Sequence, residues 1–536
     1  MHVLHRRRVL RRPLRVACAL AVAVVAASLA GPADASSPSP RTDLVVRTVD
    51  GAVRGEAHPG FRTFEGIPYA APPVGERRFR APVPPTPWRG VRDATVPGPQ
   101  CAQLSNGTGN PTTFGEDCLT LNVTTPAGRS ARRAGLPVMV WIHGGSFLTG
   151  AGSSYDASRL AVDGDVVVVT VNYRLGALGF LAHPGLSAED RRRGSGNAGI
   201  LDQQAALRWV QQNARAFGGN PRNVTVFGES AGSASVCAHL ASPQARGLFR
   251  RAIAQSYSCA SDLTVRAVAE ESGEEVAREV GCADASDVPA CLREVDAETL
   301  LRAWPGGGPV VGDGILPQQP GAALRDGTAH RVDLIHGNTL DENRLFVPLQ
   351  YGTSLTAAQY PATLGAIFGP AAPAVLARYP AEAYPSPIIA LATVFSDAGS
   401  PLSTCTHVRA YDLASERRGV RVYAYQFQDR TADPLIPLLA GQDGAAHATE
   451  LPFLFPGLFG DGLTPEQEEL SDAMVAYWTS FAATGRPHGR GLPRWPAYEG
   501  PGDVLALDLP GSGGIATEDV AEASRCGFWA TLGSVR

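Results

Sequence analysis

Short apolar runs rich in Val, Ile and other strand-forming residues recur along the middle of the chain. They lie at 138–142, 166–173, 223–227, 252–256, 332–337 and 421–427. Their apolar positions are nearly continuous and do not alternate with polar ones, as expected for strands that are covered on both faces. The pattern therefore predicts a set of buried strands.

The segments between and around these runs predict the rest of the architecture. Residues 201–220 have the spacing of an amphipathic helix that stops at Gly-Gly-Asn. Strands that alternate with helices indicate an α/β fold with a mostly parallel sheet. We further predict a hairpin over 44–56, where an Asp-Gly pair separates two β-rich halves, and extended chain in the Pro-rich stretch 66–88. The region from about 260 to 420 is expected to be helical insertion or lid material.

The N-terminal 35 residues have the pattern of a secretory signal peptide. A start with six arginines precedes the apolar run 16–30, which is short for a membrane span, and an A-x-A cleavage signature follows. We predict that residues 1–35 are the signal peptide, that 36–41 form a flexible Ser/Pro leader and that 42–536 are a single domain. The protein is then expected to be secreted without a stable membrane anchor. The choice between Sec and twin-arginine export stays open.

Composition narrows the class of partner. The chain is 44% hydrophobic and 18% charged, enough for a large buried core, and all 47 basic residues are Arg, which suggests a GC-rich bacterial genome. Removal of residues 1–35 takes away six Arg and one Asp and shifts the net charge from −4 to −9. An acidic chain without a basic run argues against nucleic acid or an anionic membrane as partner. A small molecule is the expected partner, and the oligomeric state is left open.

The cysteines favour disulfides. One of the nine, Cys18, lies in the signal peptide, and an even number remains in an exported chain. Neither CxxC nor HExxH occurs, so no metal site is expected.

A candidate nucleophile follows one of the predicted strands. Ser230 lies in G-E-S-A-G, directly after the run 223–227. Glycines on both sides permit a strained strand-to-helix turn that exposes the hydroxyl. Backbone N–H groups of Gly144 and Gly145 in "WIHGGSF", together with that of Ala231, are candidates for stabilising an oxyanion.

A serine nucleophile also needs a base and a carboxylate that orients the base. Of the histidines after Ser230, His447 is favoured because it lies in a small-residue loop, "GAAHATELPF". Asp341 and Glu342 both follow the strand-like run 332–337, at the end of a strand where such folds place functional groups. Spacing alone leaves the choice between these two carboxylates open.

Taken together, these motifs resemble the type-B carboxylesterase/lipase family, the cholinesterase-like α/β-hydrolases. Matching stretches cover nearly the whole chain after the signal peptide and include "FEGIPYAAPPVGERRF", "EDCLTLNV", "WIHGGSF", "FGGNPRNVTVFGESAG", "GNTLDE", "HATELPFLF" and "CGFW". The resemblance implies a mostly parallel central sheet with helices on both faces and helical insertions. It also implies a serine carboxylic-ester hydrolase that works through an acyl-enzyme without a cofactor.

The resemblance assigns roles to individual residues. It makes Ser230 the nucleophile, His447 the base and Glu342, in preference to Asp341, the acid. It makes Gly144, Gly145 and Ala231 the oxyanion donors. It implies the disulfides Cys101–Cys118, Cys282–Cys291 and Cys405–Cys526, with Cys237 and Cys259 as candidates for a fourth, and a structural ion pair between Arg78 and Glu116.

Alternatives remain within and outside this mechanism. A lipase or an amidase would use the same residues, and a non-catalytic binding protein of the same fold is disfavoured because the triad positions and both glycines are intact. The resemblance to cholinesterases implies a long first disulfide loop with a Trp that binds choline by a cation–π contact. Here the corresponding loop, 102–117, is short and contains no Trp, so a choline site lacks its main support. The acyl and alcohol specificity is not evident from the sequence.

Overall fold

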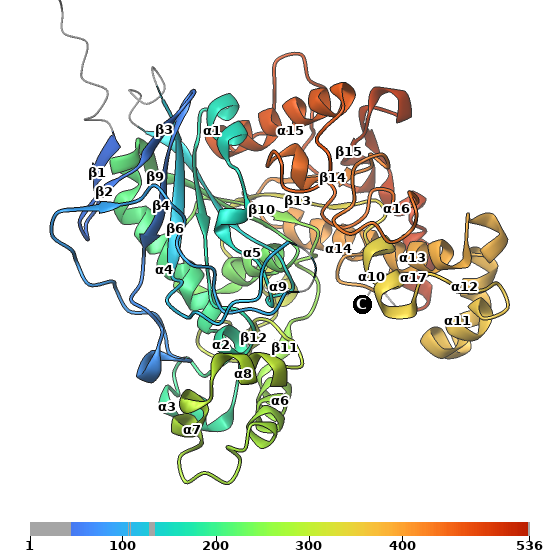
Figure 1. The fold of residues 1–536 in the computed structure, drawn as a ribbon. Coiled ribbons are helices and arrows are strands. Elements are labelled where there is room, and N and C mark those ends of the chain that lie inside the picture. Colours follow the sequence, from blue (N-terminus) through green and yellow to red (C-terminus); the bar gives the residue numbers. More distant parts are fainter. Residues whose placement is uncertain (1–43, 106, 108, 128–134, 534–536) are drawn as a thin grey trace, which may run out of the picture. The chain divides into compact units, whose positions relative to one another are not determined.

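A sheet of 11 strands forms the centre of the computed structural model, which describes residues 44–105, 107, 109–127 and 135–533 (Figure 1). The predicted signal peptide 1–35 and leader 36–41 lie outside these residues. The strand order is β16-β15-β14-β13-β10-β9-β7-β8-β6-β4-β3. In chain order the strands are β3 (Glu56–His58), β4 (Phe61–Pro68), β6 (Thr120–Pro126), β7 (Leu136–Ile142), β8 (Val167–Val171), β9 (Gly219–Glu229), β10 (Arg251–Gln255), β13 (Asp333–Thr339), β14 (Val422–Phe427), β15 (Val504–Leu507) and β16 (Ile515–Glu518).

The middle of the sheet is parallel and its two edges are antiparallel. All pairings from β8 through β7, β9, β10, β13 and β14 to β15 are parallel. The pairings of β16 with β15, and of β3, β4, β6 and β8 with one another, are antiparallel. The six predicted strands are the parallel strands β7, β8, β9, β10, β13 and β14, so the mostly parallel α/β class is confirmed.

Helices cover both faces of the sheet, which explains the continuous apolar runs. Along β7, Val138, Val140 and Ile142 enter one hydrophobic cluster, while Met139 and Trp141 enter a second. Helices α4 (Ala198–Asn213) and α5 (Ala231–Ala241) contribute to the first cluster, and α1 (Ser158–Gly164) and α15 (Pro465–Thr484) to the second. Figure 1 shows the two pairs of helices on opposite sides of the sheet.

The predicted hairpin and amphipathic helix are confirmed, with boundaries that differ from the predicted ones. Strands β1 (Val45–Arg47) and β2 (Ala52–Arg54) form the expected hairpin. Helix α4 begins before residue 201 and ends at Asn213, after which a 3-10 turn leads to Gly218, whose φ of 89° stops the helix.

The region from 260 to 420 is largely helical, as predicted, but it also supplies strand β13. An apolar stretch within it, Tyr360–Arg378, whose one charged residue is Arg378 at its end, is long enough to cross a membrane by length and composition alone. In the structure it forms two helices, α11 and α12, separated by a 3-10 turn at Gly369–Ala371. The helices of the region are α6 (Arg266–Glu279), α7 (Val288–Glu294), α8 (Ala297–Ala303), α9 (Pro320–Arg325), α10 (Asn343–Tyr351), α11 (Tyr360–Phe368), α12 (Ala372–Arg378), α13 (Pro387–Asp397) and α14 (Thr404–Ser415).

Disulfides and one ion pair tie the loops to this framework. The bonded pairs are Cys101–Cys118, Cys237–Cys259, Cys282–Cys291 and Cys405–Cys526. Arg78 and Glu116 form a two-point ion pair, with Nε to Oε2 at 2.9 Å and Nη2 to Oε1 at 2.5 Å. The fourth cysteine pair, left open by the sequence, joins α5 to the loop after β10.

Candidate active site

Ser230 occupies the sharp turn between β9 and α5. Its backbone has φ 58° and ψ −121°, a conformation that side-chain-bearing residues rarely adopt. A Cβ on Gly228 would lie 2.6 Å from the carbonyl oxygen of Ile142, and one on Gly232 would lie 2.0 Å from the same oxygen. The two glycines of the motif are therefore required by the close approach of β7, and the turn holds the Ser230 hydroxyl at the carboxyl edge of the sheet.

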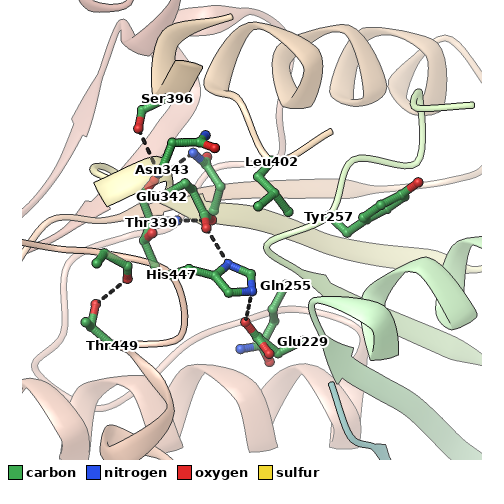
Figure 2. Close-up of polar contacts among 12 residues, drawn as sticks. Glu229, Gln255, Tyr257, Thr339, Glu342, Asn343, Ser396, Leu402, His447 and Thr449 are labelled. Carbon is green, nitrogen blue, oxygen red and sulfur yellow. Dashed lines mark hydrogen bonds and ion pairs between the residues drawn. The ribbon is translucent and has the colours of Figure 1, made fainter. Parts of the chain in front are cut away.

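His447 and Glu342 meet beside this edge (Figure 2). Glu342 follows β13 at the start of α10, and His447 lies in the loop after β14. The Nδ1 of His447 donates to Oε2 of Glu342 at 2.6 Å, and Oε1 of Glu342 accepts from the backbone N–H of Thr339 at 2.9 Å. Both side chains are buried. The backbone at the end of β13 thus holds the Glu342 carboxylate, which orients the imidazole of His447.

Asp341 points to other partners. Its carboxylate accepts from Nε of Arg430 at 2.7 Å and pairs with Nη2 of Arg344 at 2.9 Å. It also accepts from the N–H of Ala445 at 3.2 Å. Of the two neighbouring carboxylates that the sequence left open, Glu342 therefore contacts His447, whereas Asp341 anchors two arginines.

A third group, Glu229, faces the other side of the imidazole. Nε2 of His447 lies 3.0 Å from Oε1 of Glu229, the residue before the candidate nucleophile (Figure 2). His447 and Ser230 line the same cavity, but the structure gives no hydrogen bond between these two described residues. Burial by itself lowers the pKa of His447, but the negative charges of Glu229 and Glu342 outweigh burial and raise this pKa well above its ordinary value. An imidazolium donates from both ring nitrogens, which fits a carboxylate on each side.

A further buried carboxylate, Glu450, belongs to the same cluster. Burial, together with the charges of Glu229 and Glu342, raises the pKa of Glu450 to about 8, so this group is protonated at neutral pH. Its Oε1 accepts from Nε2 of Gln255 at 3.2 Å, and Gln255 in turn accepts from the indole N–H of Trp478 at 3.1 Å.

Sequence reasoning missed Glu229 and Glu450. The available signal was their position, because Glu229 lies inside G-E-S-A-G and Glu450 comes three residues after His447.

Three backbone N–H groups converge on Ser230. No backbone carbonyl in the described part of the chain accepts from the N–H groups of Gly144, Gly145 or Ala231, and the N–H of Gly144 faces the hydroxyl of Tyr155. A Cβ on Gly144 would lie 3.1 Å from Cβ of Ser230, and one on Gly145, whose φ is 100°, would lie 2.2 Å from the carbonyl oxygen of Thr149. Glycine at both positions keeps this backbone close to the serine, with donors for a negatively charged oxygen.

Ser230 and His447 open into a cavity of about 380 Å³. Much of its lining is apolar and comes from α10 and from the loops after β14, namely Leu345, Phe346, Leu349, Leu435, Ile436, Leu458 and Phe459. Leu451, Glu229, Tyr155, Asn110 and small residues complete the lining, and no Trp is among the lining residues that the structure describes. Within the described ranges no group of three His, Cys, Asp or Glu residues is placed to hold a metal ion. Apart from Glu229 and His447 the lining residues are uncharged, so the space beyond these two groups suits an uncharged ligand.

Comparisons with known proteins point to one family. A family model described as "Carboxylesterase family" matches residues 42–529. The chain is 37% identical to a para-nitrobenzyl esterase of Bacillus subtilis over 87% of this chain and 95% of the relative. It is 36% identical to a pyrethroid hydrolase, Ces2e, of Rattus norvegicus over 92% of this chain and 90% of the relative. The solved structure of a thermophilic para-nitrobenzyl esterase superposes with a TM-score of 0.76 at 35% identity, covering 91% of this chain and all of that chain.

Proposed function

Because the chain belongs to the carboxylesterase family, has the α/β-hydrolase fold and is a carboxylesterase, we propose that it hydrolyses neutral esters through an acyl-enzyme on Ser230. The observation that carries this proposal is the 2.6 Å bond between His447 and Glu342 beside a strained turn that exposes Ser230. The N–H groups of Gly144, Gly145 and Ala231, from which no described backbone carbonyl accepts, give further support.

In the proposed acylation step, the Oγ of Ser230 attacks the ester carbonyl carbon and its proton passes to Nε2 of His447. The carbonyl oxygen becomes negatively charged and accepts hydrogen bonds from the N–H groups of Gly144, Gly145 and Ala231. The intermediate then collapses: the bond to the alcohol breaks, and the alcohol leaves with the proton from His447. Water repeats the two transfers on the acyl-enzyme, which releases the acid and restores Ser230.

The carboxylates act through the imidazole in this scheme. Glu342 holds Nδ1–H in place and stabilises the imidazolium that forms in each step. Glu229 stabilises the same cation from the other side, so His447 must lose its Nε2 proton before it can accept one from Ser230. Nε2 then faces the serine in place of Glu229. We propose that Glu229 sets the pH range in which the enzyme is active.

We also propose that the protein is secreted, of bacterial origin, and that residues 1–35 are removed on export. This leaves the leader 36–41 and the domain 42–536. The disulfides of the structure fit an oxidising compartment. N-terminal sequencing of the secreted protein should find Ser36 at or near the start. A mature chain that still begins at Met1 would contradict this proposal.

The substrate class follows from the cavity. A partly apolar space of about 380 Å³, whose lining is uncharged apart from Glu229 and His447, favours neutral esters of short or medium acyl chains, such as p-nitrophenyl or p-nitrobenzyl esters. The test is kcat/KM for p-nitrophenyl esters of increasing chain length, beside the matching p-nitroanilide and an acetylcholine analogue. We expect kcat/KM to be higher for the ester than for the anilide and to be highest for esters shorter than the long-chain ones. For the choline ester, kcat/KM should exceed that of a neutral ester by no more than about tenfold.

Each other outcome of this comparison would indicate a different substrate class. Preference for the anilide would indicate an amidase, and preference for aggregated long-chain esters would indicate a lipase. Preference for choline well beyond tenfold would assign a cation site to Tyr155, Phe346 or Phe459, the aromatic residues that line the cavity.

A further inference from the structure

A second hollow lies at the opposite edge of the sheet from Ser230. Its volume is about 1190 Å³, and its walls come from the chain at the amino ends of β9, β10, β13 and β14. Arg222 is close to the start of β9, whereas Glu229 ends that strand beside the candidate active site. Seven residues of strand at roughly 3.3 Å each separate the two edges by about 23 Å. A ligand in this groove therefore leaves the cavity around Ser230 open.

The groove carries an excess of positive charge. Five arginines line it, Arg222, Arg246, Arg250, Arg331 and Arg421, against one carboxylate, Asp333. That carboxylate pairs with Arg421 at 2.5 Å. The other four guanidinium groups are exposed and form no ion pair or hydrogen bond with any residue that the structure describes.

These four charges stand out because the chain as a whole is acidic, with a net charge of −4. Like charges in one concave surface repel one another and focus a positive potential into the groove. The side chains come from separate segments of the chain, so no basic run marks them in the sequence. A ligand with several negative charges would relieve the repulsion, and the planar guanidinium group suits two-point contacts with phosphate or sulfate oxygens.

The size and the lining residues of the groove favour one class of multivalent anion. A groove of this volume exceeds what a single phosphate or sulfate ion fills, so the anion must be extended. Phe249 and His330 carry the only aromatic rings among its described lining residues, and both residues are buried. Without exposed aromatic rings the groove offers no stacking platform for bases. We propose that this groove binds a flexible polymer that carries phosphate or sulfate groups and no bases, and that it tethers the enzyme to that polymer while the active site stays accessible.

The test measures binding of the secreted, full-length mature enzyme to long-chain inorganic polyphosphate and to dextran sulfate. If each of the four unpaired arginines contacts one anionic group, log K should fall with log salt with a slope of about −3, at roughly 0.7 per contact. The triple variant Arg246→Gln, Arg250→Gln, Arg331→Gln should bind at least about tenfold more weakly in low salt, with a slope near about −1.

A matched control separates the groove from net charge. Arg47, Arg77 and Arg89 are exposed, and none forms an ion pair with a described residue, so the variant Arg47→Gln, Arg77→Gln, Arg89→Gln removes the same charge elsewhere. It should bind both polymers as the unaltered enzyme does. Both variants should hydrolyse p-nitrophenyl acetate within about twofold of the unaltered enzyme, which verifies folding, and bound polyphosphate should leave kcat unchanged.

Several results would overturn the proposal. If both triple variants lost affinity equally, or if neither polymer bound, the groove would not be the site. If orthophosphate displaced polyphosphate at an equal concentration of phosphate groups, the site would take a small anion. If a single-stranded oligonucleotide bound more tightly than polyphosphate, the groove would contact bases as well as phosphate groups.

Discussion

The two ends of the same strands hold charge in opposite ways. At the carboxyl edge, Glu229, Glu342 and Glu450 are buried around one imidazole, and the pKa of Glu450 rises to about 8. At the amino edge, the four unpaired arginines of the groove are exposed to water. Because they are buried, Glu229 and Glu342 raise the pKa values of Glu450 and His447, whereas water and ions screen the second set. The first arrangement suits proton transfer at one atom, and the second suits association with a large, mobile anion.

The largest expected effect concerns the two adjacent carboxylates at the carboxyl edge of the sheet, Asp341 and Glu342. Glu342→Gln keeps the shape of the side chain but removes the charge that stabilises the imidazolium, so kcat should fall on the order of 10⁴-fold. Asp341→Asn should lower kcat by less than about tenfold, because Asp341 contacts arginines and not His447. It should instead destabilise the fold by about 1–3 kcal/mol, since it removes the buried carboxylate that pairs with the largely buried guanidinium of Arg344.

The measurement is kcat on one neutral ester together with a thermal melt for each variant. A dead Asp341→Asn enzyme with an active Glu342→Gln enzyme would reverse the assignment of the acid. Loss of activity in both variants with unchanged melting would mean that the two carboxylates act as one unit.

A smaller effect concerns pH. Glu229 is a negative neighbour that raises the pKa of His447, so Glu229→Gln should lower this pKa. Because the base works only when neutral, activity is lost as the pH falls through this pKa, and the acidic limb of kcat/KM should move to lower pH by about one unit. The pH profiles of the two enzymes give the measurement, and Glu450→Gln serves as a control that removes a group already protonated at neutral pH. An unchanged or upward-shifted limb in Glu229→Gln would show that Glu229 does not govern the base.

The smallest effect concerns salt and distinguishes the two edges directly. Buried charges are screened much less than exposed ones. Raising the salt from about 50 to 200 mM should therefore change kcat/KM for a neutral ester by less than about twofold, while polyphosphate binding falls by about 50-fold for four contacts. A strong salt dependence of ester hydrolysis would mean that the groove and the active site are not independent.

The parallel core could be predicted from the sequence, but the sheet edges could not. Strands covered on both faces are apolar at every position, and this pattern identified β7 to β10, β13 and β14. Strand β4 was missed because it contains Gly66 and Pro68 and shifts its register between Phe64 and Ile67. Strands β15 and β16 have four residues each and are fixed by pairing with distant segments, so their local pattern was too short to indicate them.

The same contrast holds for the candidate sites. Ser230 could be found because the glycines that permit its turn are its sequence neighbours. The choice between Asp341 and Glu342 depended on Arg430 and His447, which follow them by about ninety and one hundred residues, and only the resemblance to a family pointed to Glu342. The basic groove could not be predicted at all, because the fold brings its arginines together from separate strand ends.

The central claim, an acyl-enzyme on Ser230, is tested most directly by covalent trapping. The enzyme is treated with a fluorophosphonate, which reacts with activated serines, and its peptides are mapped by mass spectrometry. We expect one adduct per chain, located on Ser230, with loss of ester hydrolysis in proportion to labelling. Ser230→Ala, with an unchanged thermal melt, should take up no label. An adduct on another residue, or full hydrolysis by Ser230→Ala, would contradict the account.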